Sequence, residues 1–146
     1  MTDAASSSAP LFDTKVVVVL GEDLAPWQEL NITAFLMTGI ATSAPDLVGE
    51  PYGDADGTQY SPMLRQPVIV LTADAETLSR VRAKAAARGD VALAIYTREL
   101  FTTSHDAANR AAVAAVPSAD LDLVGVALRG PRNAVDRIAK GARFHV

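Results

Sequence analysis

The polar stretch from Tyr96 to Arg110 holds many of the side chains that could take part in chemistry. It directly follows the apolar run 91–95, and polar groups placed where a strand ends commonly line a site in α/β proteins. A histidine beside a carboxylate can act as a general base near neutral pH. The stretch therefore predicts His105 or Glu99 as a base. Two neighbouring hydroxyl groups are candidates for a supporting role: Thr102 and Thr103.

The same residues also have a purely structural interpretation. Ser104 is a natural N-cap for a helix over 105–115, and Asp106 in its first turn would meet the helix dipole favourably. Asp106 and Arg110 are four residues apart and would form an ion pair on one face of the helix. His105 and Asn109 are also four residues apart and would share a face. If Arg110 instead faces a cleft, its guanidinium would favour a carboxylate or phosphate ligand.

A second polar cluster follows the apolar run 16–20 and begins with Gly21-Glu22-Asp23. We expect it to lie beside the first cluster, so that Asp23 or Glu99 can pair with His105. Trp27 has two interpretations, because it also lies on an apolar stripe of the following helix and would then pack in the core. The stripe consists of Trp27, Leu30, Ala34, Phe35, Leu36 and Met37. The predicted ligand-binding side chains are Asp23, Trp27, Asn31, Tyr96, Arg98, Asn109 and Arg110.

Composition narrows the classes of partner. The 13 basic and 17 acidic residues give a net charge of −4, which opposes tight binding to nucleic acid. No cysteine is present, and the only imidazoles are His105 and His145, so the sequence predicts no metal site and no cofactor. No apolar run approaches the roughly 20 residues of a membrane span. We expect a cytoplasmic protein without a membrane partner.

Short apolar runs alternate with longer helical patterns, which predicts an α/β fold with both faces of its sheet covered. A turn-rich stretch over 50–62 is typical of a surface hairpin. Residues 1–14 are expected to form a flexible arm ahead of a single domain over 15–146. The expected strands are 15–20, 67–72, 91–96 and 123–128. The expected helices are 26–41 with Pro26 in its first turn, a helix to Arg88 with Asp74 as its N-cap, 105–115 and 131–140.

Five segments together resemble a bacterial family of unknown function, the domain of unknown function two thousand (DUF2000). The resemblance covers the chain from Lys15 onward. It implies the three-layer α/β/α fold of type II peptidyl-tRNA hydrolases, with a small mixed sheet between helices, and it implies no known activity. The segments that carry it are the run from Lys15 to Leu36, Gly49-Glu50-Pro51-Tyr52, the run from Ala94 to Phe101, the run from His105 to Arg110, and Leu128-Arg129-Gly130-Pro131.

Comparison with the hydrolase pattern weakens the case for that activity, since one fold can host many functions. Asp23-Leu24 resembles the Asp-Leu pair after the first strand. The hydrolase pattern has lysine where this chain carries Asn31 and histidine where it carries Thr38 or Gly39. Its Asp-Ala-Gly-Arg-Thr motif is absent from 97–103. Loss of the lysine removes a charge-assisted contact to a phosphate-rich substrate.

The sequence is compatible with two functions. The favoured one is a module that binds a small polar or anionic ligand, and the alternative is a hydrolase-like enzyme with His105 or Glu99 as base. The alanine-rich helix over 105–115 offers a surface that can pack closely against a second copy, so a symmetric homodimer is also predicted. Both functions depend on one geometric expectation, that four side chains meet around a shared hollow: Asp23, Asn31, Glu99 and His105.

Overall fold

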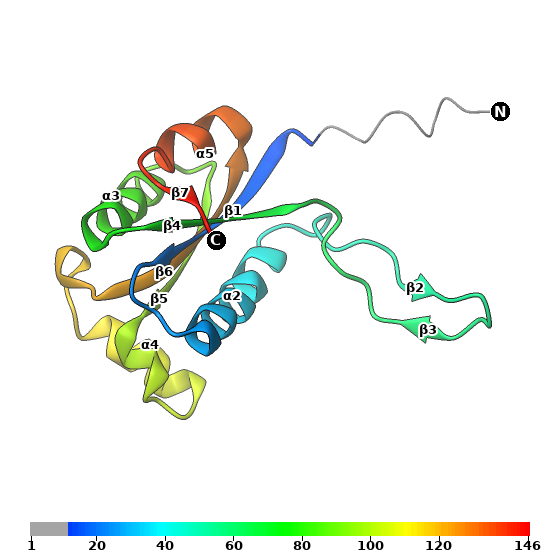
Figure 1. Ribbon diagram of the computed structural model, residues 1–146, viewed down its shortest axis with the longest axis horizontal. Coiled ribbons are helices and arrows are strands. Elements are labelled where there is room, and N and C mark those ends of the chain that lie inside the picture. The colour runs from blue at the N-terminus through cyan, green and yellow to red at the C-terminus, as the bar shows by residue number, and fades with distance from the viewer. Residues whose placement is uncertain (1–11) are drawn as a thin grey trace.

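The computed structural model describes residues 12–146 and is built on a mixed five-stranded sheet with helices on both faces (Figure 1). The strands lie in the order β5-β6-β1-β4-β7. Their bounds are β1 Thr14–Gly21, β4 Val68–Ala73, β5 Ala92–Thr97, β6 Leu123–Pro131 and β7 Arg143–Phe144. The four α-helices of this part of the chain are α2 Pro26–Ala41, α3 Ala75–Ala86, α4 Asp106–Ala114 and α5 Arg132–Ile138. The predicted α/β class is confirmed.

The direction of the strands determines which loops share an edge of the sheet. β1 runs parallel to β4 and antiparallel to β6, and β6 runs antiparallel to β5. The carboxyl ends of β1, β4 and β5 therefore lie at one edge. However, β6 separates β1 from β5, so the loops after these two strands are not direct neighbours.

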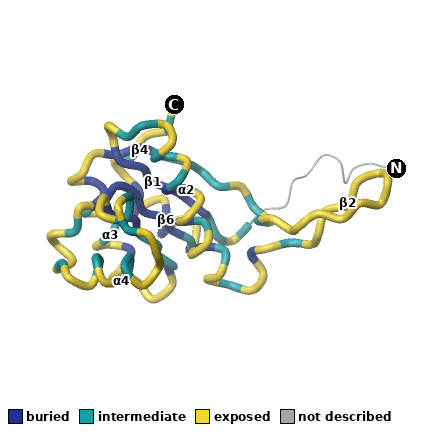
Figure 2. The backbone as a smooth tube through the Cα atoms, turned by 90° about the horizontal axis from the view of Figure 1, so that it is seen from below, coloured by how far each residue is buried: buried dark blue, intermediate teal, exposed yellow. Residues whose placement is uncertain are grey.

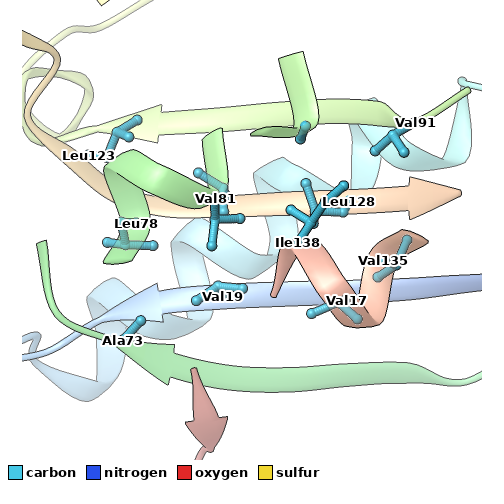
Figure 3. Packing of buried hydrophobic residues seen from close by; sticks show 12 residues of the cluster. Val17, Val19, Ala73, Leu78, Val81, Val91, Leu123, Leu128, Val135 and Ile138 are labelled. Atoms are coloured by element: carbon cyan, nitrogen blue, oxygen red, sulfur yellow. The ribbon is translucent and has the colours of Figure 1, made fainter. Parts of the chain in front are cut away.

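Strand alternation divides the core into two apolar clusters on opposite faces of the sheet. Val16, Val18 and Leu20 of β1 pack under α2, where they meet buried side chains of that helix. The intervening valines Val17 and Val19 pack on the other face under α3 and α5, as Figure 3 shows. In Figure 2 the buried backbone is concentrated in these central strands. Both faces are covered, as the apolar runs predicted.

Helix α2 lies unusually close to the sheet at Gly125 of β6. A methyl group added at Gly125 would come within 2.5 Å of the Ile32 Cγ2 atom. The side chains that α2 buries are those of Ile32, Leu36 and Ile40. Leu36 is thus buried as the expected apolar stripe requires, but the stripe is wrong for three other members: Trp27, Leu30 and Phe35 are 59%, 73% and 55% exposed.

The predicted turn at 50–62 is confirmed as the hairpin of β2 (Tyr52–Gly53) and β3 (Gln59–Tyr60). Figure 1 shows it extending away from the sheet. The Asp54 carboxylate accepts hydrogen bonds from the Tyr60 hydroxyl and from the backbone N–H groups of Asp56 and Thr58. The Tyr60 bond, followed by the backbone bonds, lowers the pKa of Asp54.

Element boundaries agree with expectation where a residue type marks them. Pro26 begins α2, which ends at Ala41 as predicted, and Asp74 caps α3 by accepting from the Thr77 N–H at 2.8 Å. The C-terminal third agrees less well, because β6 continues to Pro131 and β7 was not foreseen. Most of the expected arm, residues 1–11, lies outside the described residues, and β1 already includes Thr14.

Within residues 12–146, none of the helices is both long enough and apolar enough to cross a membrane.

Candidate functional site

A groove runs between α2 and α4 over the face of β5 that carries Ala94 and Tyr96, and we call it the α2/α4 groove. It consists of two adjoining hollows of about 400 and 590 Å³. Ala94 and Tyr96 of β5 contribute to its floor. The two hollows are continuous because they share five lining side chains: Phe35, Tyr96, Leu100, Asp106 and Asn109.

Four aromatic rings form a connected series along one end of this groove. The Trp27 and Phe101 ring centres are 5.5 Å apart, and those of Phe101 and Tyr96 are 5.1 Å apart. The Phe35 ring continues the series at 5.9 Å from Tyr96. These tilted and edge-on contacts are the preferred geometries of aromatic pairs. The series gives the groove an apolar wall that is partly open to solvent.

Polar groups lie among the rings. The Tyr96 hydroxyl, on a side chain that is 4% exposed overall, accepts a hydrogen bond from Asn31 Nδ2 at 3.4 Å. Burial raises the pKa of Tyr96, while the Asn31 bond acts in the opposite direction and has the smaller effect. The hydroxyl therefore stays protonated and keeps an O–H that can donate. On the other wall the Thr103 hydroxyl donates to the Asn109 side-chain oxygen.

His105 lines the groove but serves as the N-cap of α4. Its Nδ1 atom accepts a hydrogen bond from the Ala108 N–H at 3.2 Å, with an extended backbone at His105. The expectation that Ser104 caps this helix is therefore wrong by one residue. The cap occupies the lone pair that a general base would need, and among residues 12–146 neither Glu99 nor Asp23 forms an ion pair with His105.

The remaining residues of the first polar stretch lie apart from the groove or are already paired. Glu99 is exposed in a 3₁₀ turn, and its backbone oxygen accepts from the Thr102 hydroxyl. The Arg98 guanidinium pairs with Asp122 at 3.1 Å. The predicted ion pair between Asp106 and Arg110 is confirmed, so the Arg110 charge at the groove is balanced.

Asp23 lies in a different hollow, which we call the β1/β4 hollow because it opens at the carboxyl ends of those strands. It has a volume of about 450 Å³, and its lining includes Asp23, Glu29, Thr72 and His145. Asp23 adopts a positive φ of 61° there, a conformation that aspartate tolerates better than most residues. The expectation that Asp23 and Glu99 share one hollow with Asn31 and His105 is therefore wrong.

Helix geometry explains this separation. Residues four apart on a helix share a face, so Trp27 and Asn31 both point toward the α2/α4 groove. Glu29 follows Trp27 by two residues and lies on nearly the opposite side of α2. The first turn of α2 thus supplies side chains to both hollows and stands between them.

Several lining residues were not foreseen. Phe35 was expected in the core, and Phe101 was not assigned to a site. The signal for Phe35 was present in α2, which is apolar around most of its circumference and therefore must expose some large side chains. Phe101 lies outside α2, in the 3₁₀ turn that follows β5. Thr72 and His145 of the second hollow carried no local signal, since 73 positions separate them in the chain. The described residues contain no group of three or more potential metal ligands.

Comparison with known proteins gives a family but no activity. A family model described as "Protein of unknown function (DUF2000)" matches residues 14–146. A solved structure of a protein of unknown function from Agrobacterium tumefaciens strain C58 is similar, with 43% sequence identity and a TM-score of 0.86. The alignment covers 93% of this chain and 100% of that one. No match was found among curated proteins.

Proposed function

This protein belongs to the DUF2000 family of unknown function, and we propose that it is a small-ligand-binding module whose α2/α4 groove is the binding site. One observation supports this proposal most directly. A connected series of four aromatic rings, two of them solvent-exposed, surrounds side-chain amides and a protonated hydroxyl in one groove. Apolar walls with a few placed polar groups are the usual composition of small-molecule sites.

The charges around the groove favour a neutral polar ligand over an anionic one. Arg110 is balanced by Asp106, and Arg98 is held by Asp122 away from the lining. The polar groups that can recognise a ligand include the amide of Asn31 and the hydroxyl of Tyr96, which together can donate and accept. A ligand with an apolar or flat aromatic body and an uncharged polar group fits these features.

The hydrolase alternative has less support. The N-cap bond of His105 opposes its use as a base, and Glu99 is outside the groove. We also propose that the fold is related to that of type II peptidyl-tRNA hydrolases, on the basis of the mixed sheet and Asp23-Leu24. That relationship does not imply the activity here, because Asn31 stands where the hydrolase pattern has lysine.

Trp27 offers a direct test because it is the only tryptophan and lies at the groove. A library of neutral heteroaromatic compounds should include members that change Trp27 emission in a saturable way. Asn31→Ala should then raise Kd by about fivefold, the effect of losing one hydrogen bond of about 1 kcal/mol. Leu30→Ala is the matched control, since Leu30 is 73% exposed on the same helix and outside the lining, and its Kd should not change.

Other outcomes would decide against this function. If no compound changes Trp27 emission and the emission depends instead on protein concentration, light scattering should show a dimer that covers the groove. Turnover of a bound compound that is lost in a folded His105→Ala variant would favour the hydrolase alternative. Equal weakening of binding by Asn31→Ala and Leu30→Ala would show that the ligand binds elsewhere.

A further inference from the structure

Three side chains of the β1/β4 hollow lie in the order hydroxyl, imidazole and carboxylate. The Thr72 Oγ1 atom is 2.6 Å from His145 Nδ1. The other ring nitrogen of His145, Nε2, is 3.3 Å from Glu29 Oε2. All three residues line the same hollow of about 450 Å³. This order is that of a nucleophile, a general base and a group that orients the base.

Each of the three is held by a different element. Thr72 is on the face of β4 that carries Val68 and Val70, so it points toward α2, and it is 8% exposed. Glu29 is in the first turn of α2. His145 directly follows β7, and its backbone N–H donates to the Val70 carbonyl at 3.1 Å. The imidazole is therefore anchored through its main chain as well as its ring.

The two ring contacts assign opposite roles to the nitrogens of His145. Glu29 can only accept when ionised, so it favours the tautomer with the proton on Nε2. Nδ1 then presents a lone pair to the Thr72 hydroxyl, which donates. In this tautomer the imidazole is ready to take the hydroxyl proton. His105 differs because its Nδ1 lone pair is used by a backbone N–H.

We propose that the β1/β4 hollow is a second functional site, at which Thr72 is an acyl-accepting nucleophile and His145 its general base, with Glu29 as a positioning residue. The inference is independent of the ligand-binding function proposed for the α2/α4 groove. The constellation is recognised by geometry and role, because such groups recur in different chain orders on unrelated folds.

The proposed step is acyl transfer from an ester. The Thr72 oxygen forms a bond to the carbonyl carbon while its proton passes to His145 Nδ1. The bond from that carbon to the alkoxy oxygen breaks, and the departing alcohol takes the proton from Nδ1. Water then attacks the acyl-threonine, again giving a proton to Nδ1, and the released Thr72 oxygen takes that proton back. Glu29 remains ionised throughout and stabilises the charged imidazole.

The charge of the hollow limits the class of ester. Glu22 is paired with Arg143 at 2.7 Å, which leaves Asp23 and Glu29 as further carboxylates along the lining. An acyl group that carries its own carboxylate would be repelled there. The volume of about 450 Å³ suits a small molecule. The substrate class is therefore a small ester with a neutral or cationic acyl group.

A neutral alkyl fluorophosphonate provides the test, because it reacts with activated hydroxyl groups and the phosphorus–oxygen bond it forms can be located by peptide mass spectrometry. The probe should label Thr72 of the full chain with loss of fluoride. Thr72→Ser should keep the labelled position, whereas Thr72→Val should lose it. Glu29→Gln should slow labelling, since an amide can donate to Nε2 and favour the wrong tautomer. His145→Ala should slow labelling by about 100-fold, the contribution of a general base.

The control is Thr38→Val, which makes the same change at an exposed hydroxyl of α2 and should label at the normal rate. Circular dichroism establishes that each variant is folded. No label on the folded natural protein would overturn the proposal, and so would labelling at Thr72 that is unchanged in folded His145→Ala. If the three residues only hold β7 in place, their variants would change the melting temperature without any labelling to lose.

Discussion

The two histidines of this protein, in two regions on either side of α2, differ in what their Nδ1 atoms contact. In the α2/α4 groove, His105 Nδ1 accepts from the Ala108 backbone N–H and caps a helix. In the β1/β4 hollow, His145 Nδ1 contacts the Thr72 hydroxyl and its other nitrogen contacts Glu29. The residue type is the same, but the partners give one imidazole a structural role and leave the other a usable lone pair. The position of a histidine near carboxylates in the sequence is thus a weaker indicator of a general base than the contacts of its two ring nitrogens in the structure.

The surroundings of the two histidines also suit different roles. The groove around His105 has aromatic walls and a charge pair that cancels, which suits recognition of an uncharged molecule. The hollow around His145 has carboxylates from two segments of the chain and a buried hydroxyl, which suits proton transfer. Because α2 contributes to both, any change in its position should affect them together.

The largest expected effect tests this common dependence on α2. Gly125→Ala would place a methyl group 2.5 Å from Ile32 Cγ2, so α2 would have to move away from β6. Overpacking of this kind costs about 1–3 kcal/mol in the free energy of unfolding. We expect a lower urea midpoint, together with altered Trp27 emission and slower Thr72 labelling.

Gly89→Ala is the matched control for that variant. A methyl group at Gly89 meets no atom within 4 Å, so its unfolding free energy should stay the same or rise slightly. A Gly125→Ala protein with the stability of Gly89→Ala and with both regions intact would contradict the view that α2 couples them.

The second prediction compares the two histidines by the same substitution. His145→Ala leaves the buried Thr72 hydroxyl without its partner and removes the Glu29 contact, and it should cost about 1–2 kcal/mol in the free energy of unfolding. His105→Ala removes one N-cap bond and should cost about 0.5–1 kcal/mol. Urea unfolding measures both. The reverse order of the two values would show that the α4 cap, and not the His145 contacts, is the more important for the fold.

The sequence predicted the parts of this comparison that depend on local patterns. β1 and β4 follow from apolar, β-branched runs, of which β1 is buried on both faces and β4 is partly buried, and Pro26 marks the start of α2. Three of the predicted ligand-binding residues, Asn31, Tyr96 and Asn109, line the α2/α4 groove, and their role in binding stays a prediction. These residues lie close to the strand and helix ends that the pattern locates.

The sequence did not predict which side of a helix is buried or which segments far apart in the chain pair with each other. Periodicity could not decide which side of α2 is buried, because Trp27, Leu30 and Phe35 are as apolar as Ile32, Leu36 and Ile40. Packing against Gly125 decides it. The second hollow depends on β7, a two-residue strand that pairs with β4 and brings His145 to Thr72. Such a short pairing leaves no periodic signal.

The smallest expected effect concerns the hydroxyl groups of the two regions. Thr72 donates to an imidazole, whereas the Tyr96 hydroxyl accepts from an amide and is kept protonated by burial, which raises its pKa above the ordinary 10.0. A group whose pKa is raised in the folded state adds stability that is fully present below its unfolded pKa and is lost as pH rises through the folded value.

The unfolding free energy should therefore decrease as pH rises above about 10, the ordinary tyrosine pKa, and Tyr96→Phe should reduce that slope. Tyr60 provides the comparison, because the Asp54 hydrogen bond, and not burial, is the main cause of the raised pKa of Tyr60. Removing Asp54 with Asp54→Asn should lower the titration midpoint of Tyr60 and leave that of Tyr96 unchanged, as ultraviolet absorbance of tyrosinate would show. If Tyr96 instead ionised with the exposed tyrosines, the groove would be wet and charged at alkaline pH, and a neutral ligand would lose its advantage there.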